Sequence, residues 1–328
     1  MKKIRCVDFK VCCSGHGVVN HNGNVKVLNG HTTVNNHNIP KMRGYTSRKA
    51  CQNKDTGESF LGYKEPDELN LLENPMYISP NCSRKEIFQK ENEGLPPVLK
   101  HEDAHKLLFG IPGLIKGYMV VGEKNEKGRA PHSAGRSTAL TVESITEQTG
   151  NGNFEQFATS GKKDSSSIYS KVTFGDTKYI GYMSLSIENL RFISLDTAID
   201  KSAAAPRLVD NTFGDDLAKG IQSYIESINQ KPDLKPTATF GKFFKTTGYK
   251  METTVGIYLN DDAIDILVDN LIKLIDNLEI RRCSGWMTVD SVIVDYNDGK
   301  MMRIKKSETI CNNTKPEDAS YTEYFTKA

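Results

Sequence analysis

The sequence lacks the features that identify a membrane protein or a secreted protein. Its 328 residues contain no apolar run of about 18 residues, the length that a membrane-spanning helix needs. The opening residues Met-Lys-Lys-Ile-Arg are not followed by the apolar centre of a secretion signal. We therefore expect a cytoplasmic protein.

Patterns for metal binding by cysteine and for common hydrolytic chemistry are also missing. The seven cysteines include no Cys-x-x-Cys pair, which argues against a zinc knuckle, and their odd number in a cytosolic chain argues against a disulfide framework. No G-x-x-x-x-G-K-[ST] or G-x-S-x-G sequence occurs, so neither nucleotide hydrolysis nor α/β-hydrolase chemistry is indicated. We predict no cofactor and no metal.

Positive charge is concentrated near the start of the chain. Residues 1–54 hold ten Lys and Arg but a single acid, Asp8, whereas the whole chain has a net charge of only +2. Such an uneven distribution suits a polyanionic partner. The basic residues are densest between Ile39 and Ala50, where Pro40 precedes an expected helix that begins at Arg43. From charge and proximity we predict phosphate contacts there, made by Lys41, Arg43, Tyr45, Arg48 and Lys49.

Hydrophobic periodicity predicts an α+β fold. Residues 4–13 alternate apolar and polar, the pattern of a half-buried strand, and residues 261–278 carry one apolar stripe at helical spacing. The order of elements predicts a ferredoxin-like or RRM-like βαββαβ core in a single domain spanning 1–328. Hydrophobic residues make up only 37% of the chain, so we expect large insertions outside the core. Further expectations are strands at 114–121 and 138–142, a hairpin of 289–296 with 301–304, insertions at about 53–100 and 123–178, and a loosely held polar tail at 311–328.

Three further places could contact nucleic acid. The segment Glu279 to Val289, expected to be a loop, contains Arg281, Arg282, Gly285 and the only tryptophan, Trp286, which offers charge and a stacking face. A glycine-rich stretch after the first strand carries His16. A basic hairpin tip or loop at 123–137 ends with Arg136.

Two of these motifs resemble those of a known superfamily. Ile39-Pro40, then Met42-Arg43-Gly44 and Arg48, is similar to the helix start of the RAMP superfamily of CRISPR-associated RNA-binding proteins. Arg281 to Trp286 resembles their glycine-rich loop. The chain in particular resembles the backbone subunit of a type I CRISPR surveillance complex (Cascade), with a type I-F variant among the candidates.

This resemblance implies a palm with a thumb-like hairpin and a side lobe, the thumb lying within 53–100 or 123–178. It implies that copies stack along a CRISPR RNA, together with other Cascade subunits, and present the guide for pairing with target DNA in antiviral defence. By position, Arg43, Arg48, Arg281 and Arg282 would contact phosphates. The expected role is binding and not catalysis.

Other functions remain open. The chain could bind the 5′ handle of the CRISPR RNA as a single-copy cap, or cleave precursor RNA through His16 and His21. His101-Glu102-Asp103-Ala104-His105 matches the H-E-x-x-H pattern of zinc metalloproteases. A charged residue inside the motif, Gly110 and Pro112 soon after it, and the lack of an evident third ligand make a solvated polar turn the better interpretation.

Overall fold

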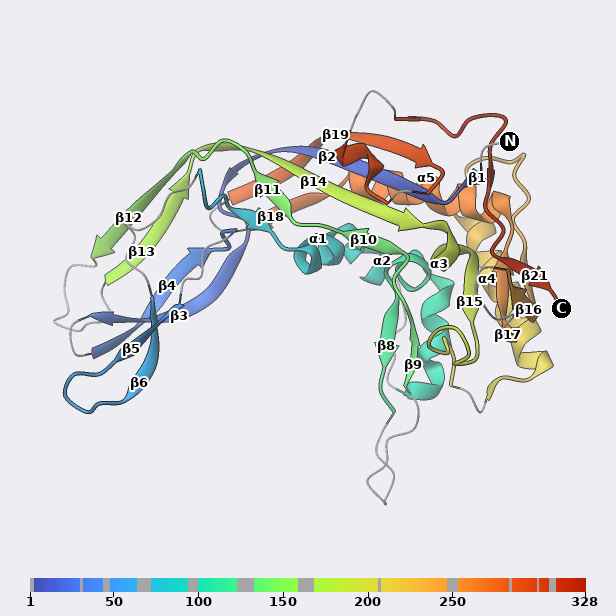
Figure 1. Cartoon of the computed structure of the whole chain (residues 1–328), viewed down its shortest axis with the longest axis horizontal. Coiled ribbons are helices and arrows are strands. Elements are labelled where there is room, and N and C mark those ends of the chain that lie inside the picture. The colour runs from blue at the N-terminus through green and yellow to red at the C-terminus, as the bar shows by residue number, and fades with distance from the viewer. Residues whose placement is uncertain are drawn as a thin grey trace, which may run out of the picture.

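The computed structural model describes most of the chain. The described residues are 3–29, 32–43, 48–63, 72–93, 100–122, 133–158, 168–205, 208–246, 253–282, 285–299, 301–306 and 311–328. They form a mixed α/β fold with curled sheets and several helices (Figure 1). None of the described helices is long and apolar enough to cross a membrane.

A seven-stranded antiparallel sheet runs through the body of the molecule (Figure 1). Its strand order is β18-β19-β2-β14-β11-β7, and β10 also pairs with β14. The strands are β2 (Cys6–Gly17), β7 (Tyr77–Ile78), β10 (Leu140–Val142), β11 (Ile145–Glu147), β14 (Asp176–Ser186), β18 (Glu279–Arg282) and β19 (Gly285–Asn297).

The sequence of β2 explains its place between β14 and β19. Val7, Phe9 and Val11 are fully buried on one face, whereas Ser14 and His16 on the other face reach solvent. A strand with one apolar face can pack on helices through that face and leave the other open. The predicted strand at 4–13 is confirmed, and it continues to Gly17.

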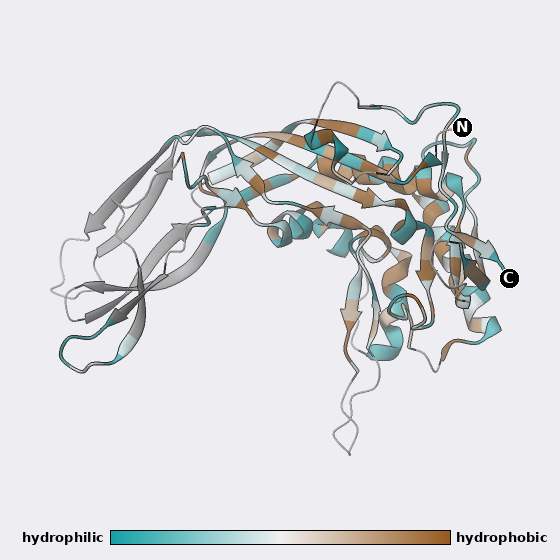
Figure 2. Ribbon diagram, in the orientation of Figure 1, coloured by the Kyte–Doolittle hydropathy of each residue, from teal (hydrophilic) through white to brown (hydrophobic). Residues whose placement is uncertain are grey.

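Helices pack in the body of the molecule, and one of the two longest, α5 (Asp261–Asp276), packs directly on β19. The other long helix is α4 (Asn211–Ser227); the shorter ones are α1 (Pro80–Ile87), α2 (Gln89–Glu93), the 3₁₀ helix η2 (His101–Phe109) and the π-helical turn η3 (Pro112–Lys116). The predicted helix at 261–278 is confirmed as α5. The Asn260 side chain caps it by accepting a hydrogen bond from the Ala263 amide at 3.0 Å, and Leu267 and Leu271 are fully buried. Apolar segments in Figure 2 follow these helices and strands.

A second sheet lies beside the helices, in the order β15-β17-β16-β21. It contains β15 (Phe192–Ser194), which follows the short helix α3 (Ile187–Arg191), β16 (Ala238–Lys245), β17 (Thr253–Leu259) and β21 (Phe325–Lys327). Phe192 and Phe325 stack there with ring centroids 4.1 Å apart. The chain ends are joined as well, because β1 (Lys3–Ile4) pairs in parallel with β20 (Ser320–Tyr321).

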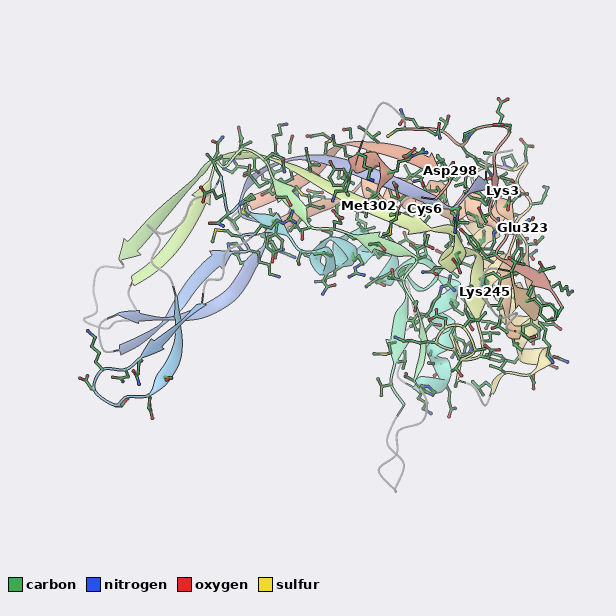
Figure 3. All side chains as sticks on the ribbon, in the orientation of Figure 1. Lys3, Cys6, Lys245, Asp298, Met302 and Glu323 are labelled. Carbon is green, nitrogen blue, oxygen red and sulfur yellow. The ribbon has the colours of Figure 1, made fainter. Side chains whose placement is uncertain are left out.

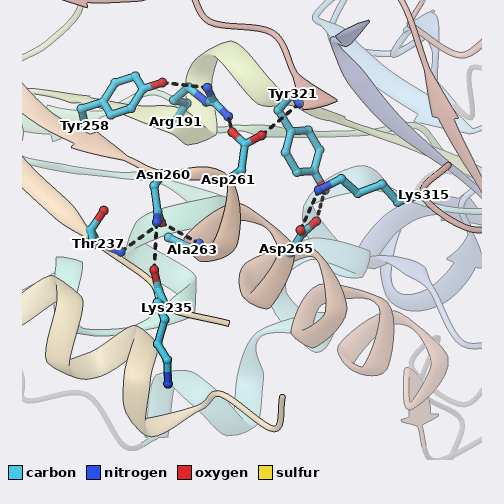
Figure 4. A network of polar contacts seen from close by, with 10 residues as sticks. All are labelled: Arg191, Lys235, Thr237, Tyr258, Asn260, Asp261, Ala263, Asp265, Lys315 and Tyr321. Atoms are coloured by element: carbon cyan, nitrogen blue, oxygen red, sulfur yellow. Dashed lines mark hydrogen bonds and ion pairs between the residues drawn. The ribbon is translucent and has the colours of Figure 1, made fainter. Parts of the chain in front are cut away.

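The expectation of a loosely held tail at 311–328 is therefore wrong. The segment 311–328 is polar on average, but Tyr321 within it is fully buried. The Tyr321 hydroxyl donates a hydrogen bond to Asp265 at 2.7 Å (Figure 4). Lys315 pairs with the same carboxylate at 2.6 Å. A few aromatic anchors hold the tail, and composition averaged over the segment conceals them.

The outer parts of the chain are strand hairpins that extend from the body (Figure 1). One arm holds a four-stranded sheet, β12-β13-β4-β3, and the hairpin of β5 and β6; a separate hairpin of β8 and β9 projects elsewhere. The bounds are β3 (His21–Asn29), β4 (Thr32–Pro40), β5 (Arg48–Gln52), β6 (Ser59–Tyr63), β8 (Tyr118–Val120), β9 (Ala134–Arg136), β12 (Gly152–Ala158) and β13 (Ile168–Phe174).

Three local predictions differ from the structure. The expected helix after Pro40 is not found in its described part: Met42 bridges Met76, and residues 48–52 form β5, whose hairpin is closed by Gly57 at φ 71°. Residues 112–116 are helical, so the strand expected at 114–121 is reduced to β8. Residues 303–305 form the 3₁₀ turn η6 (Arg303–Lys305) instead of a strand, because Arg303 folds back onto Asp295.

Candidate nucleic-acid interface

One end of the central sheet gathers several of the predicted residues. The β18–β19 hairpin and the last residues of β2 meet there, and we call this the hairpin end. In the strand register Arg281 is opposite Trp286, Trp286 is opposite His16, and His16 is opposite Asp176. Side chains at paired positions share one face of a sheet, so these four form a row across β18, β19, β2 and β14. The sequence predicted a loop at 279–289, whereas residues 279–282 and 285–289 lie on strands in the structure.

The row is open to solvent. Side-chain exposure is 53% for His16 and 80% for Arg281, and Trp286 is 44% exposed. A groove of about 630 Å³ lies at this end, lined by His16, Glu279, Arg281, Arg282, Gly285, Trp286 and Thr288. Trp286 therefore does not fill the core, although its neighbour Met287 is fully buried.

Acidic neighbours orient two of the exposed side chains. Nδ1 of His16 lies 3.0 Å from Oδ1 of Asp176, which fixes the ring and turns Nε2 away from the carboxylate. Arg281 forms an ion pair with Glu279, two residues earlier on the same strand. Neither acid was among the predicted site residues. Residues two apart on a strand share a face, so the spacing of Glu279 and Arg281 could have identified Glu279 from the sequence.

Arg282 lies on the opposite face of the hairpin, the face that α1 covers. Its Nη2 contacts Oε1 of Glu86 at 2.8 Å, and the Glu86 side chain is only 11% exposed. Burial alone would lower the pKa of the Arg282 guanidinium, but the hydrogen bond and charge of Glu86 raise it overall. Arg282 is thus a cation held in place by a nearly buried acid on another element.

His21, at the start of β3, is half-buried near Arg282. Burial lowers the pKa of its imidazole, and the charge of Arg282 lowers it further, so the ring is neutral at pH 7. Within the described residues, no hydrogen bond joins His21 to His16, and the two rings have different charged neighbours.

Lys41 and Arg43 belong to a short segment that adjoins the same end. The Lys41 amide donates to Asn20 at 3.0 Å and the Arg43 amide donates to Pro75 at 2.9 Å, while Met42 between them is buried. Lys41 is partly exposed and Arg43 is exposed. No carboxylate of the described residues lies within ion-pair distance of either side chain, so both charges are available to an anion.

The remaining residues predicted from the 39–50 motif cannot be placed in the interface. Tyr45 lies outside the described residues, and so do the side chains of Arg48 and Lys49. The backbone of Arg48 and Lys49 lies in β5, on the outer arm.

The charge of residues 1–54 is spread along the molecule and not gathered at one place. Lys3 and Arg5 lie at the far end of the sheet, near the chain termini (Figure 3). Because β2 runs the length of the sheet, basic residues that are close in sequence lie far apart along the molecule.

The structure contradicts the prediction that Arg136 binds nucleic acid. Arg136 is 5% exposed, and its guanidinium donates to four backbone carbonyls. The acceptors are the carbonyls of Leu114 (3.1 Å), Phe192 (3.0 Å), Asn189 (2.7 Å) and Leu190 (3.2 Å). This arginine joins β9 to η3 and α3. A basic residue in a basic stretch can be structural, and sequence pattern does not separate the two roles.

The H-E-x-x-H motif does not form a metal site. It lies on the 3₁₀ helix η2, where residues four apart are rotated by about 120° and do not share a face. Nδ1 of His105 is 2.8 Å from the Glu102 carbonyl. Across the described ranges, no group of three or more His, Cys, Asp or Glu is placed to bind a metal ion.

Gly285 has a structural reason to be glycine. A Cβ atom there would lie 2.5 Å from the His16 carbonyl oxygen and 2.7 Å from the Val18 amide nitrogen. The atoms closest to Gly285 thus belong to β2 and the residues just after it, and this close approach lets β19 carry Trp286 beside His16.

Comparison with protein families gives a match over nearly the whole chain. The family described as "Type I-Fv CRISPR-associated protein Cas7fv-like" matches residues 3–328. No curated protein matches the chain.

Proposed function

The chain belongs to the Cas7fv-like family of type I-Fv CRISPR-associated proteins, and from this premise we propose that it binds the sugar-phosphate backbone of CRISPR RNA as a repeating subunit. Membership of this family implies a CRISPR RNA-binding backbone subunit of a Cascade-type complex, with other Cascade subunits as partners. The finer proposal is that copies line up along one RNA in the cytoplasm and leave most bases exposed for pairing with target DNA in antiviral defence.

The observation that carries the proposal is the set of exposed cations at and beside the hairpin end. Arg43, Arg281 and Arg282 are exposed and Lys41 partly so, and they come from two segments more than 200 residues apart in sequence. Phosphate contacts of this kind supply affinity without reading sequence, which leaves sequence recognition to base pairing. We also infer a ferredoxin-like core, since β2 lies between β14 and β19 and α5 packs on β19.

We propose further that the protein does not cleave RNA. His16 is the one histidine of the groove lining, and the two nearby carboxylates already have partners, since Asp176 contacts His16 itself and Glu279 pairs with Arg281. Substituting His16 by Ala should leave any RNA cleavage in the preparation unchanged. Loss of a cleavage product, with RNA binding retained, would favour the endonuclease alternative.

The first test is to purify the full chain with co-expressed CRISPR RNA and digest the complex with nuclease. A repeating subunit protects RNA in regular steps, whereas a cap on the 5′ handle protects one fragment. The double variant Lys41→Ala with Arg43→Ala should bind less RNA and show a salt slope smaller by about 2, because each substitution leaves one phosphate without its cation.

The matched control is Lys219→Ala with Lys242→Ala, which removes two exposed cations from α4 and β16. Equal loss of binding in both double variants would mean that total charge matters and that the hairpin end does not.

A further inference from the structure

We propose that the groove at the hairpin end holds one unpaired RNA base, stacked on the indole of Trp286, with Arg281 on an adjoining phosphate. This inference rests on the proposed function and deepens it, because it adds a base-binding site to a protein expected to grip the RNA backbone.

The indole ring lies where a stacking partner could reach it. Trp286 is held on a strand by its pairing with His16 and Arg281, so its backbone position is fixed before any ligand binds. Yet 44% of this large aromatic residue remains exposed. An indole that stays in water does not contribute the stabilisation that its burial would give. An exposed aromatic side chain in a concave site is typical of a binding site.

The neighbours of the ring fit a nucleotide better than an apolar ligand. Arg281 is opposite Trp286, and 80% of its side chain is exposed, so its charge can reach a ligand in the groove. Its partner Glu279 holds the guanidinium but is itself only 42% exposed. A cation beside a π face matches the two parts of a nucleotide, the phosphate and the base.

His16 completes the site on the other side of Trp286. Asp176 holds Nδ1 of His16, whose side chain is 53% exposed, and Nε2 is left to contact a base edge or a ribose hydroxyl. The groove volume of about 630 Å³ is within the range of small-ligand sites, about 300–1,000 Å³. A base that occupies it cannot pair at the same time, so the site selects single-stranded RNA over a duplex.

Trp286 is the only tryptophan of the chain, so its fluorescence reports on this site alone. The full chain is titrated with a short single-stranded oligoribonucleotide that carries an end label. Label anisotropy measures binding, and tryptophan emission measures stacking. The same oligonucleotide with abasic positions keeps every phosphate, and a fully paired duplex hides every base.

We expect the single strand to quench Trp286 and the abasic strand to bind with little quenching. Trp286→Ala should weaken binding of the single strand by about 5- to 150-fold, the range for one stacked base, and Trp286→Phe should retain most of it. The control Met119→Ala truncates another exposed apolar side chain, on β8, and should change nothing. Thermal unfolding of each variant verifies that it is folded.

The outcomes separate this inference from the proposed function. Binding of the single strand without quenching, or equal quenching by the abasic strand, overturns the base site and leaves the backbone grip intact. Trp286→Ala with unchanged affinity has the same meaning. No anisotropy change with any RNA overturns both proposals.

Discussion

The two ends of one sheet face differ sharply, although β2, β14 and β19 form both. At the hairpin end, His16 and Trp286 are open to solvent. At the other end, which we call the closed end, Asp8 and Asp295 on the same face are fully buried. Arg303 covers them: its side chain contacts Asp295 at 2.6 and 2.9 Å, and its amide donates to Asp8 at 2.8 Å. The cover is the segment around η6, near Met302 in Figure 3.

The difference shows that strand alternation assigns a side chain to a face but does not decide whether that face is buried. Asp8 also accepts hydrogen bonds from Ser184 at 2.5 Å and Asn297 at 2.8 Å, so the closed end satisfies its polar groups internally. The hairpin end leaves polar and aromatic groups for a partner. Stability should therefore depend on the closed end and RNA binding on the hairpin end.

The largest expected effect comes from breaking the closed end. Asp295→Ala leaves Arg303 without its main partner and should lower the free energy of unfolding by about 3–5 kcal/mol. Asp290→Ala removes an acid from the same strand near the open end, where it is 44% exposed, and should cost no more than about 1 kcal/mol. Chemical denaturation measures both. Similar losses of stability for the two variants would contradict the distinction between the closed end and the hairpin end.

The second effect concerns α5, which packs on β19. Leu271 is fully buried on α5, and Leu271→Ala should destabilise the protein by about 2–5 kcal/mol through reduced burial and a cavity. Lys273→Ala, on the exposed side of the same helix, serves as the control. A change within error for Leu271→Ala would mean that this position does not contribute to the core.

The third effect separates two adjacent arginines of the hairpin end. Arg281→Ala and Arg282→Ala should each weaken RNA binding and reduce the salt slope by about 1. Only Arg282→Ala should also destabilise the fold, by about 1–3 kcal/mol, because Glu86 is left nearly buried and unpaired.

Adding Glu86→Gln to Arg282→Ala tests this explanation. The second substitution removes the unpaired charge, so the double variant should regain stability without regaining RNA affinity. If stability does not recover, the loss in Arg282→Ala has another origin than the carboxylate of Glu86.

The smallest effect is the pH dependence of the closed end. Burial raises the pKa of the Asp8 carboxyl, and Asp295 raises it further, against the hydrogen bonds that lower it. At pH values between the pKa of Asp8 in the unfolded state and its higher pKa in the folded state, the folded state binds more protons than the unfolded state. The free energy of unfolding therefore falls as the pH rises through this window. The stability of Asp8→Asn relative to wild type should therefore increase as pH rises above about 4. A difference that stays constant with pH would contradict the raised pKa.

Several parts of the fold and site followed from local sequence. The alternation of residues 4–13 predicted β2, and the stripe and cap of residues 260–278 predicted α5, because both patterns are set by backbone geometry within a few residues. His16, Arg281 and Trp286 were each named as candidate RNA contacts from the sequence, and the strand register brings these three side by side. Other predictions required knowledge of partners: β5 replaces a helix because it pairs with β6, and Arg136 is buried because four carbonyls from distant segments surround it.

The sequence by itself determined which side chains share a face, which helix packs beneath the sheet, and that the chain belongs with CRISPR RNA-binding proteins. Only the tertiary structure decided that η6 returns over Asp8 while no described segment covers His16, that Glu86 reaches Arg282, and that Tyr321 anchors the tail. The reason is physical. Periodicity is a property of a few consecutive residues, whereas burial and charge pairing depend on segments that lie up to about 300 positions away along the chain.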